Sequence, residues 1–517
     1  MQERLQRAAG ILCPVSSLPS PYGIGTFGKA AYQFIDLLKE AGQRYWQVLP
    51  IGPTGYGDSP YQPYSAFAGN PYFIDPELLM EEGLLTEEEV KGYKWSDTDS
   101  YISYDRIYNC RFPALYLAYS RSNHKNTREY MEFVWENGDD WLYDFALYCA
   151  CKKFYDQKSW LEWPDEVRFR DEEKMAELQV RLKDEIEFQI FLQYEFRKQW
   201  TNLKQYAHEN DVRIIGDIPL YMALDSADVW ANPHLFCLDE DRRPTRVAGC
   251  PPDAFSADGQ LWGNPIYDWK VHEAEDFAWW KKRMRANAAN YDVIRIDHFI
   301  GIVRYFNIPA GDTTARNGWF EWGPGKKLTD AIDSAIGNEC RIVAEDLGIM
   351  IPQVKELLAE TGYPGMKVLQ FGFDGSRDND HLPYNYNGNC LVYCGTHDNE
   401  TLTGFVTGKN HVTDVKNMAR YFDVSSLADE TDGNETIREE AVRELREKVF
   451  RGMYASTAVL AILTVSDLLG LGNEARINTP STSGDNWKWR IAPGQLSAET
   501  LEQYHLKELA ELFGRLG

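Results

Sequence analysis

The sequence predicts an α/β protein built on a (β/α)8 barrel (TIM barrel), with large, mainly helical insertions after strands 2 and 3. Eight short apolar or β-branched runs end in polar residues, as the strands of a buried parallel sheet do. Helical patterns lie between many of these runs, and alternation of eight strands with helices is typical of the barrel. Two of the connections are far longer than ordinary β-to-α loops, so we expect them to contain inserted structure.

The eight predicted strands are residues 10–15, 45–51, 213–220, 293–299, 341–347, 366–371, 390–395 and 461–468. The clearest helical patterns between them are residues 29–42, 352–361 and 437–460. Catalytic residues of such barrels sit at the C-terminal ends of the strands. The residues that follow each apolar run are therefore the first place to look for chemistry.

The insertions follow from the spacing. About 160 residues separate the second predicted strand from the third, and about 70 separate the third from the fourth. We expect one catalytic barrel domain over 1–517, a mostly helical insertion at 65–205 and a second insertion at 221–290. In the first insertion, residues 86–89 (T-E-E-E) form a capping-box signature and residues 169–208 have helical spacing.

The tail at 497–517 is expected to pack on the barrel as a closing helix, because its apolar residues recur at helical spacing. The residues on this predicted apolar face are Leu501, Tyr504, Leu509, Leu512 and Leu516.

Composition excludes several classes of protein. Of the 517 residues, 44% are hydrophobic and 26% charged, and no apolar run approaches the ~20 residues of a membrane span. The 54 Lys and Arg against 79 Asp and Glu give a net charge of −25, which repels phosphate backbones and anionic lipid surfaces. We therefore expect neither nucleic acid nor a membrane as a partner. The N-terminal residues show no secretory signal, which predicts a cytoplasmic location.

Two apparent motifs are set aside. The nine cysteines are scattered and never spaced C-x-x-C, so they are expected to be buried thiols rather than metal ligands or a redox pair. Residues 23–28 (G-I-G-T-F-G) match the dinucleotide fingerprint, but a Ser/Pro loop separates them from the preceding strand. The following strand also lacks the acidic residue that binds the ribose. We interpret these glycines as a tight loop near a pocket.

Three acidic residues at the ends of three predicted strands are the central observation: Asp297, Glu345 and Asp398. Arg295 and Asp297 point the same way from their strand, and the guanidinium keeps the carboxylate ionised and nucleophilic. Glu345, held protonated by burial and negative neighbours, fits a general acid. Retaining glycosyl transfer needs such a pair, ~5–5.5 Å apart. One acid alone would more simply form a salt bridge or a helix cap, but three at equivalent places favour a catalytic site.

His298 and His397 each lie next to one of these acids. A single histidine is usually a packed core residue, but here contact with substrate hydroxyls is the better interpretation. Adjacent His-Asp pairs on separate strand ends lack the spacing and number of ligands of a metal site. The sequence therefore predicts no bound metal.

Longer stretches of the chain resemble the 4-α-glucanotransferases, the amylomaltase or disproportionating-enzyme family related to α-amylases. The resemblance covers essentially the whole chain, whereas the three acids alone would indicate only the wider amylase-like group. Besides the acidic motifs, the matching stretches are 16–25 (S-S-L-P-S-P-Y-G-I-G), 55–62 (G-Y-G-D-S-P-Y-Q), 216–219 (G-D-I-P), 249–253 (G-C-P-P-D), 260–263 (Q-L-W-G) and 473–476 (N-E-A-R).

The resemblance implies a retaining transglycosylase that moves α-1,4-glucan segments between maltooligosaccharides or starch and glycogen chains. Glucose would serve as a further acceptor, and no metal or organic cofactor is implied. It implies Asp297 as nucleophile, Glu345 as acid/base and Asp398 as the carboxylate that binds ring hydroxyls. The implied substrate contacts are Arg295, His298, His397 and Asp217 at the donor site, and Ser59, Tyr61, Gln260, Trp262 and Tyr56 at neighbouring glucose units.

The stretch 249–263 is expected to fold over the bound glucan as a Gly/Pro/Asp-rich loop that keeps water out. Two alternatives remain. An α-amylase-like hydrolase of α-1,4-glucans would use the same acids, and only its products would differ. A catalytically silent glucan-binding or scaffolding protein is disfavoured, since all three acids are intact.

Overall fold

Eight parallel strands form one sheet at the centre of the chain, in the order β10-β11-β12-β1-β2-β3-β6-β9. The computed structural model describes residues 4–55, 57–252, 256–428, 439–482 and 484–516. The N–H of Ala344 in β9 donates a 2.9 Å hydrogen bond to the carbonyl of Pro364, just before β10, so the barrel is nearly closed. The strands are β1 (Ala8–Leu12), β2 (Tyr45–Gln47), β3 (Arg213–Ile218), β6 (Val293–Ile296), β9 (Arg341–Ala344), β10 (Gly365–Val368), β11 (Cys390–Tyr393) and β12 (Leu460–Thr464).

All eight predicted strands are present, which confirms the barrel. All eight end earlier than predicted, and after β12 the chain turns at once into α20 (Val465–Leu468). The strands are buried because helices cover the barrel from outside. Packing between the strands and the helices outside them is close enough to exclude a side chain at Gly216 of β3, where a Cβ would lie 2.2 Å from the ring of Tyr291.

An outer layer of helices covers the barrel. In the first of them, α1, Ala31, Phe34, Ile35 and Leu38 are buried at helical spacing. The predicted helix at 352–361 is confirmed, since it begins with a proline at the first helical position and ends before the left-handed Gly362. The long outer helices are α1 (Lys29–Glu40), α9 (Lys183–Glu209), α12 (Ala278–Asn290), α14 (Lys326–Ile336), α15 (Pro352–Thr361) and α19 (Glu439–Ala455).

The alternation of strands and helices breaks between β10 and β11. Residues 369–389, all of them described, contain no α-helix and only the 3-10 turns η7 (Leu369–Phe371) and η8 (Pro383–Asn385). This stretch is rich in Asp, Asn and Gly, whose side chains and backbone favour turns over helix. The barrel therefore lacks one helix of its outer layer.

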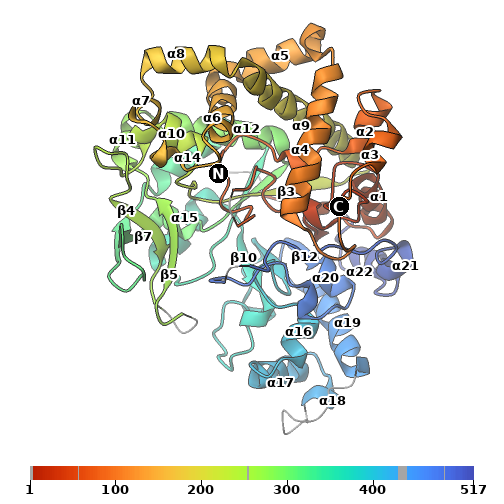
Figure 1. Cartoon of the computed structure of the whole chain (residues 1–517). Helices are drawn as coiled ribbons and strands as arrows, with labels where there is room; N and C mark the ends of the chain where they lie inside the picture. The colour runs from red at the N-terminus through yellow and green to blue at the C-terminus, as the bar shows by residue number, and fades with distance from the viewer. Residues whose placement is uncertain (1–3, 56, 253–255, 429–438, 483, 517) are drawn as a thin grey trace.

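The long connection between β2 and β3 is helical and forms the upper part of the molecule in Figure 1. The predicted capping box is confirmed, with Thr86 and Glu89 bonded reciprocally at the start of α3. The predicted division of the chain at 65–205 and 221–290 stays a prediction. Before α9, the helices are α2 (Pro76–Glu81), α3 (Glu87–Lys91), α4 (Tyr104–Arg121), α5 (Arg128–Asn137), the π-helix η4 (Gly138–Leu142), α6 (Tyr143–Phe154), α7 (Asp165–Arg168) and α8 (Glu172–Arg181).

A second, four-stranded antiparallel sheet lies beside the barrel, in the order β5-β4-β7-β8 (Figure 1). Two strands come from the connection after β3 and two from the connection after β6, so the expectation of a mainly helical insertion missed this sheet. Local periodicity did not reveal it because its pairing joins segments on both sides of a barrel strand. The strands are β4 (Arg246–Cys250), β5 (Gln260–Pro265), β7 (Arg304–Pro309) and β8 (Trp319–Trp322).

The C-terminal tail differs from the single closing helix that was predicted. His505 adopts a left-handed backbone (φ 51°) and divides the tail into two helices. Leu501, Tyr504 and Leu506 are buried, but Leu512 is 63% exposed, so its place on the apolar face was wrong. The remaining helices are α10 (Ala227–Ala231), α11 (Trp269–Ala274), α13 (Ile300–Val303), α16 (Leu402–Thr407), α17 (Val412–Tyr421), α18 (Ser425–Ala428), α21 (Ala498–Glu502) and α22 (Leu506–Leu512).

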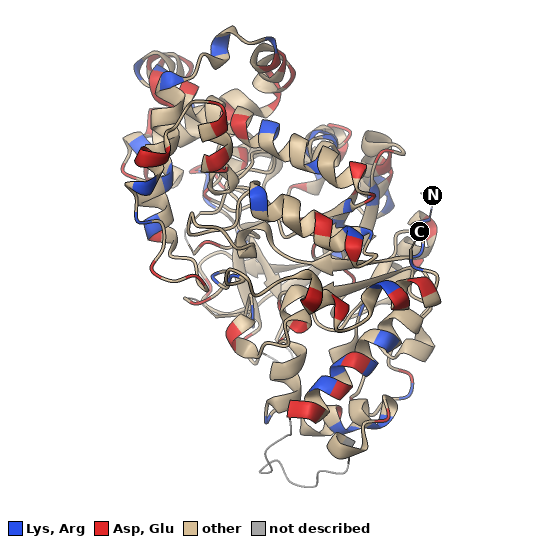
Figure 2. Ribbon diagram, turned by 90° about the vertical axis from the view of Figure 1, so that its right-hand side faces the viewer, with Lys and Arg blue, Asp and Glu red and all other residues tan. Residues whose placement is uncertain are grey.

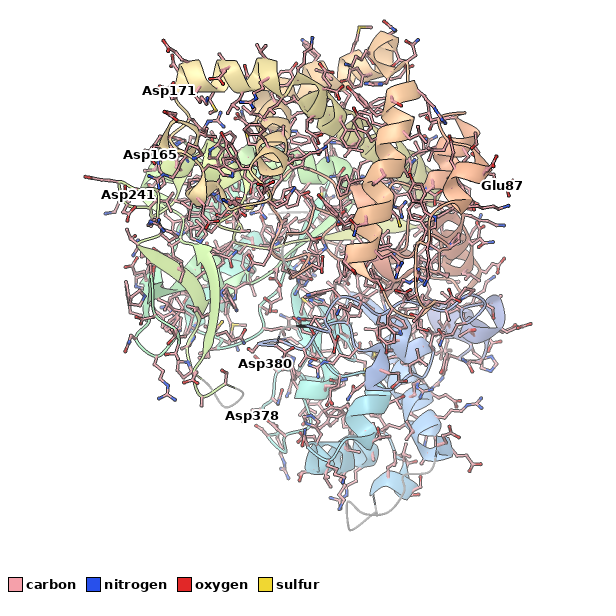
Figure 3. The ribbon with its side chains drawn as sticks, viewed as in Figure 1. Glu87, Asp165, Asp171, Asp241, Asp378 and Asp380 are labelled. Atoms are coloured by element: carbon pink, nitrogen blue, oxygen red, sulfur yellow. The ribbon has the colours of Figure 1, made fainter. Side chains whose placement is uncertain are left out.

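The charged side chains lie mainly on the outside of the molecule. Figure 2 shows acidic and basic residues interspersed along the outer helices. In Figure 3, Glu87, Asp165, Asp171 and Asp241 project outward from the edges of the molecule. None of the helices in the described ranges combines the length and the apolar character of a membrane span. Acidic residues buried inside the barrel are exceptions to this distribution, and they mark the candidate site.

Candidate active site

Three carboxylates lie at the C-terminal end of the barrel. Asp297 comes directly after β6, Glu345 directly after β9, and Asp398 a short turn after β11. β6 and β9 pair in parallel with Ile296 opposite Ala344. Asp297 and Glu345 therefore hold equivalent positions at the ends of adjacent strands.

Arg295 links Asp297 to a further carboxylate, that of Asp217, beneath the opening of the barrel. Its Nη1 donates to both oxygens of Asp217 in β3, at 2.8 and 2.6 Å, and lies 2.9 Å from Oδ1 of Asp297. Arg295 and Asp217 are buried, whereas the side chain of Asp297 is 28% exposed. The guanidinium thus balances a buried carboxylate and orients a second one that a substrate can reach.

Tyr61 extends this network to the other side of the barrel. Its hydroxyl donates a 2.9 Å hydrogen bond to Oδ2 of Asp217 and lies 3.5 Å from Nδ1 of His397. The two rings are stacked, with centroids 5.0 Å apart and planes inclined by 15°. Residues from the β2–β3 connection, from β3 and from the end of β11 therefore meet in one polar layer.

Glu345 is buried and held by backbone N–H groups. Its Oε2 accepts from the N–H of His298 at 2.7 Å, and its Oε1 accepts from the N–H of Leu347 at 2.8 Å. Burial, and then the negative charge of Asp297, raise the pKa of Glu345 to about 8, against the opposing effects of Arg295 and the two backbone bonds. Glu345 is therefore mainly protonated at neutral pH, as a general acid must be.

His298 has an unusual backbone. Its φ of 53° is left-handed, which is uncommon for a residue with a side chain, and this turn directs its N–H at Glu345. Burial lowers the pKa of the His298 ring to about 4, so the ring is neutral at pH 7. The ring packs edge-to-face on Trp262, with centroids 4.8 Å apart.

Asp398 is fixed by a segment whose role the sequence analysis missed. Asn478 Nδ2 donates to Asp398 Oδ1 at 2.6 Å, and Arg476 Nη2 donates to the backbone carbonyl of Asp398 at 2.7 Å. His397 Nε2 lies 3.4 Å from Asp398 Oδ2. Arg476 stood in a stretch that matched the family, but no local signal linked Asn478 to Asp398.

The strand β5 forms a further wall of the candidate active site. Gln260 and Trp262 lie two residues apart on β5, and Trp262 Nε1 donates to Gln260 Oε1 at 3.0 Å. Gln62 and Asn264 exchange hydrogen bonds of 2.9 and 3.0 Å between their side-chain amides. This second pair, which the sequence did not predict, ties the segment carrying Tyr61 to the strand carrying Trp262.

The structure thus brings nearly all predicted site residues into one connected region. Ser59 is connected to this region only through its neighbour Tyr61, whose backbone N–H donates a 3.3 Å hydrogen bond to Ser59 Oγ. Tyr56 lies outside the described residues. The predicted covering loop at 249–263 begins and ends in strands β4 and β5, and its residues 253–255 lie outside the described residues.

The chemistry of this arrangement is that of a pair of carboxyl groups with different tasks. Asp297 is reachable and oriented by a guanidinium, whereas Glu345 is buried and keeps its proton near neutral pH. Such a pair is suited to acid-assisted displacement at an acetal carbon. In the part of the chain that the structure describes, no group of three or more His, Cys, Asp or Glu residues is arranged to hold a metal ion.

Comparison with known proteins points to one family. The model of the family described as 4-alpha-glucanotransferase matches residues 13–497. The chain is 44% identical over 518 residues to a 4-alpha-glucanotransferase of Thermus thermophilus, covering 99% of this chain and 100% of the relative. It is 43% identical over 502 residues to one of Clostridium butyricum, covering 97% and 99%. The fold matches an amylomaltase from Streptococcus agalactiae solved in complex with acarbose, with a TM-score of 0.90, 37% identity and coverage of 99% and 100%.

Proposed function

Because the chain belongs to the 4-α-glucanotransferase family, we propose that it uses maltooligosaccharides and longer α-1,4-glucans as both donors and acceptors, with glucose as a further acceptor. The chain transfers α-1,4-glucan segments, as its full-length relatives do. The single observation that carries the mechanism is the asymmetry of two neighbouring carboxyl groups. Arg295 binds Asp297, while burial raises the pKa of Glu345 to about 8.

The first half of the reaction breaks the glycosidic bond. A carboxylate oxygen of Asp297 attacks the anomeric carbon of the donor, while Glu345 gives its proton to the departing 4-oxygen. The bond from carbon to the leaving oxygen breaks as the ester bond to Asp297 forms. Glu345 becomes a carboxylate, and its two backbone N–H donors stabilise that charge.

The second half reverses these steps with a new sugar. Glu345, now a base, takes the proton from the 4-hydroxyl of the acceptor, whose oxygen attacks the anomeric carbon and releases Asp297. Two inversions give net retention of the α-configuration. Arg295 binds Oδ1 of Asp297 from the buried side of the site, which leaves the other carboxylate oxygen of Asp297 available in each cycle.

The surrounding residues position the sugar. Asp398 is partly exposed, and Asn478 holds one of its oxygens, which leaves the carboxylate able to accept hydrogen bonds from ring hydroxyls. The neutral imidazole of His298 provides a donor or an acceptor beside the same ring. Trp262 presents an apolar face of the kind that stacks on the C–H faces of glucose. We assign Gln260, Ser59 and Tyr61 to neighbouring glucose units.

Transfer competes with hydrolysis at the covalent intermediate. A glucan bound by aromatic and amide groups holds its hydroxyl at a high effective concentration, and coverage of the site reduces access for water. The stretch 249–263 is our candidate for that cover. An α-amylase-like hydrolase remains the alternative that the experiment below separates.

The test is incubation of the purified protein with maltotriose, followed by chromatography and a reducing-end assay. A transferase gives glucose together with a ladder of longer oligomers, while the number of reducing ends stays nearly constant. The Asp297→Asn variant should give no ladder. A steady rise in reducing ends without longer products would identify a hydrolase instead.

A further inference from the structure

A cavity of about 240 Å³ lies apart from the candidate active site, and none of its lining residues belongs to that site. It is enclosed by η4 and the start of α6 on one side, and by α10, η6 (Pro233–Leu235) and α12 on the other. The cavity therefore sits where the helical connection after β2 meets the segments around α10 and α12. No step of the proposed mechanism uses it.

Aromatic side chains form part of the cavity wall. The rings of Phe67 and Trp141 are nearly parallel, with centroids 6.0 Å apart and an angle of 12° between the planes. Trp279 closes a further side, edge-to-face with Phe67 at 6.1 Å. Flat aromatic side chains of this kind stack on rings that have an apolar face.

One buried carboxylate lies in this wall. Asp228 is 4% exposed and accepts hydrogen bonds from two neutral donors, the N–H of Ala66 at 2.8 Å and Trp279 Nε1 at 3.2 Å. Each carboxylate oxygen keeps capacity for a further donor. Burial raises the pKa of Asp228 to about 6, so it is mainly a carboxylate at pH 7 and can accept hydroxyl groups.

Three of the four acids at the rim face a basic side chain, and the fourth, Asp139, is exposed to solvent. Lys282 Nζ lies 2.8 Å from Asp140 Oδ1, and His234 Nε2 lies 3.3 Å from Glu275 Oε1. A third rim acid, Asp144, is paired with an arginine. Because three of these four acids already face bases and the acids outnumber the bases, the opening favours a neutral polar ligand over an anion.

We propose that this cavity is a second saccharide site, which binds one pyranose ring of an α-glucan against Trp141 and Phe67. Its volume lies below the ~300 Å³ at which ordinary small-molecule sites begin, which suits one ring rather than an oligosaccharide. The ring hydroxyls donate to Asp228 and accept from the side chain of Lys282. The choice of glucose among neutral pyranoses rests on the proposed function.

The test is calorimetric titration of the full-length Asp297→Asn protein with maltotriose and, separately, with glucose. In this background, Trp141→Ala removes the stacking surface, and Ala278→Trp fills the cavity from an exposed position without removing any packing. The matched control is Trp135→Ala, because Trp135 is 85% exposed on α5 and does not line the cavity.

We expect one saccharide-binding event to weaken at least tenfold in both cavity variants and to persist in the control. If saccharide binding is the same in Ala278→Trp as in the parent, the proposal is wrong, whatever the folding of Trp141→Ala. A parallel titration uses spermidine as a cationic ligand. The proposal is also wrong if the cavity variants abolish binding of spermidine while the binding of sugar does not depend on the cavity. With an intact Asp297, the cavity variants should still form the maltotriose ladder, so failure here is distinct from failure of the proposed function.

Discussion

The backbone N–H of His298 donates a 2.7 Å hydrogen bond to Oε2 of Glu345 and so joins the turn after β6 to the acid after β9. The left-handed φ of His298 makes this bond possible, one residue after the carboxylate of Asp297. The geometry of the two carboxyl groups is therefore set by the backbone of a single turn. Their different environments then determine which of them holds a proton.

We expect the rate of transfer to fall above pH about 8, tenfold for each further pH unit, because Glu345 loses the proton that the leaving oxygen needs. The measurement is the initial rate of glucose release from maltotriose between pH 5 and 10. Glu345→Gln should lower kcat at least a thousandfold. A rate that stays constant up to pH 10 would contradict the assignment.

The same group affects stability. The pKa of Glu345 is raised above the ~4.3 of an unfolded glutamate, so its stabilising contribution is complete below pH ~4.3 and is lost as the pH rises through about 8. Glu345→Gln cannot ionise and escapes this loss. Its melting temperature should therefore exceed that of the parent increasingly from pH 5 to 8, and equal shifts at pH 4 and pH 8 would refute this explanation.

Asp217→Ala should destabilise the fold more than Asp297→Ala. Asp217 is 1% exposed and pairs with Arg295, so its removal leaves a buried guanidinium with one carboxylate partner, at a cost of about 3–5 kcal/mol. Asp297 is partly exposed, and its loss leaves the Arg295–Asp217 pair intact. Urea denaturation measures both free energies of unfolding. Comparable losses would mean that Arg295 relies equally on the two carboxylates.

The amide pair of Gln62 and Asn264 should position the two walls of the site. Gln62→Ala and Asn264→Ala are each expected to lower kcat/KM for maltotriose about tenfold, or about 1.4 kcal/mol, and the double variant should be little worse than the poorer single one. Gln205→Ala, at an exposed position on α9, is the control. Fully additive losses would show that the two side chains act independently.

Asn478→Asp should be more damaging than Asn478→Ala. The new carboxylate faces Oδ1 of Asp398 at the 2.6 Å contact where the amide now donates, so two negative groups repel each other. We expect kcat to fall at least tenfold relative to the alanine variant. Asn317→Asp, on an exposed loop, controls for added charge. The difference in kcat between Asn478→Asp and Asn478→Ala should shrink at low pH, where one of the two facing carboxyl groups is protonated.

Much of the barrel and of the acidic centre could be predicted from the sequence. The eight apolar runs became the eight strands, and Asp297 and Glu345 could be placed because each lies near the end of such a run. The four-stranded sheet could not, because β4 pairs with β7 across an intervening barrel strand. The contacts of Asn478 and Gln62 were missed for the same reason, since each joins segments that are distant in the chain. Leu512 fitted a helical pattern that His505 interrupts.

The strand β7 begins just beyond the turn that holds Asp297 and His298, and it pairs with β4, the neighbour of β5. The backbone that follows Asp297 is thus connected, through the one intermediate strand β4, to the strand β5 that carries Trp262. Thermal loosening of either part should spread to the other. On gradual heating, the segments that carry Trp262 and Asp297 should therefore lose their order together, ahead of the barrel that supports them.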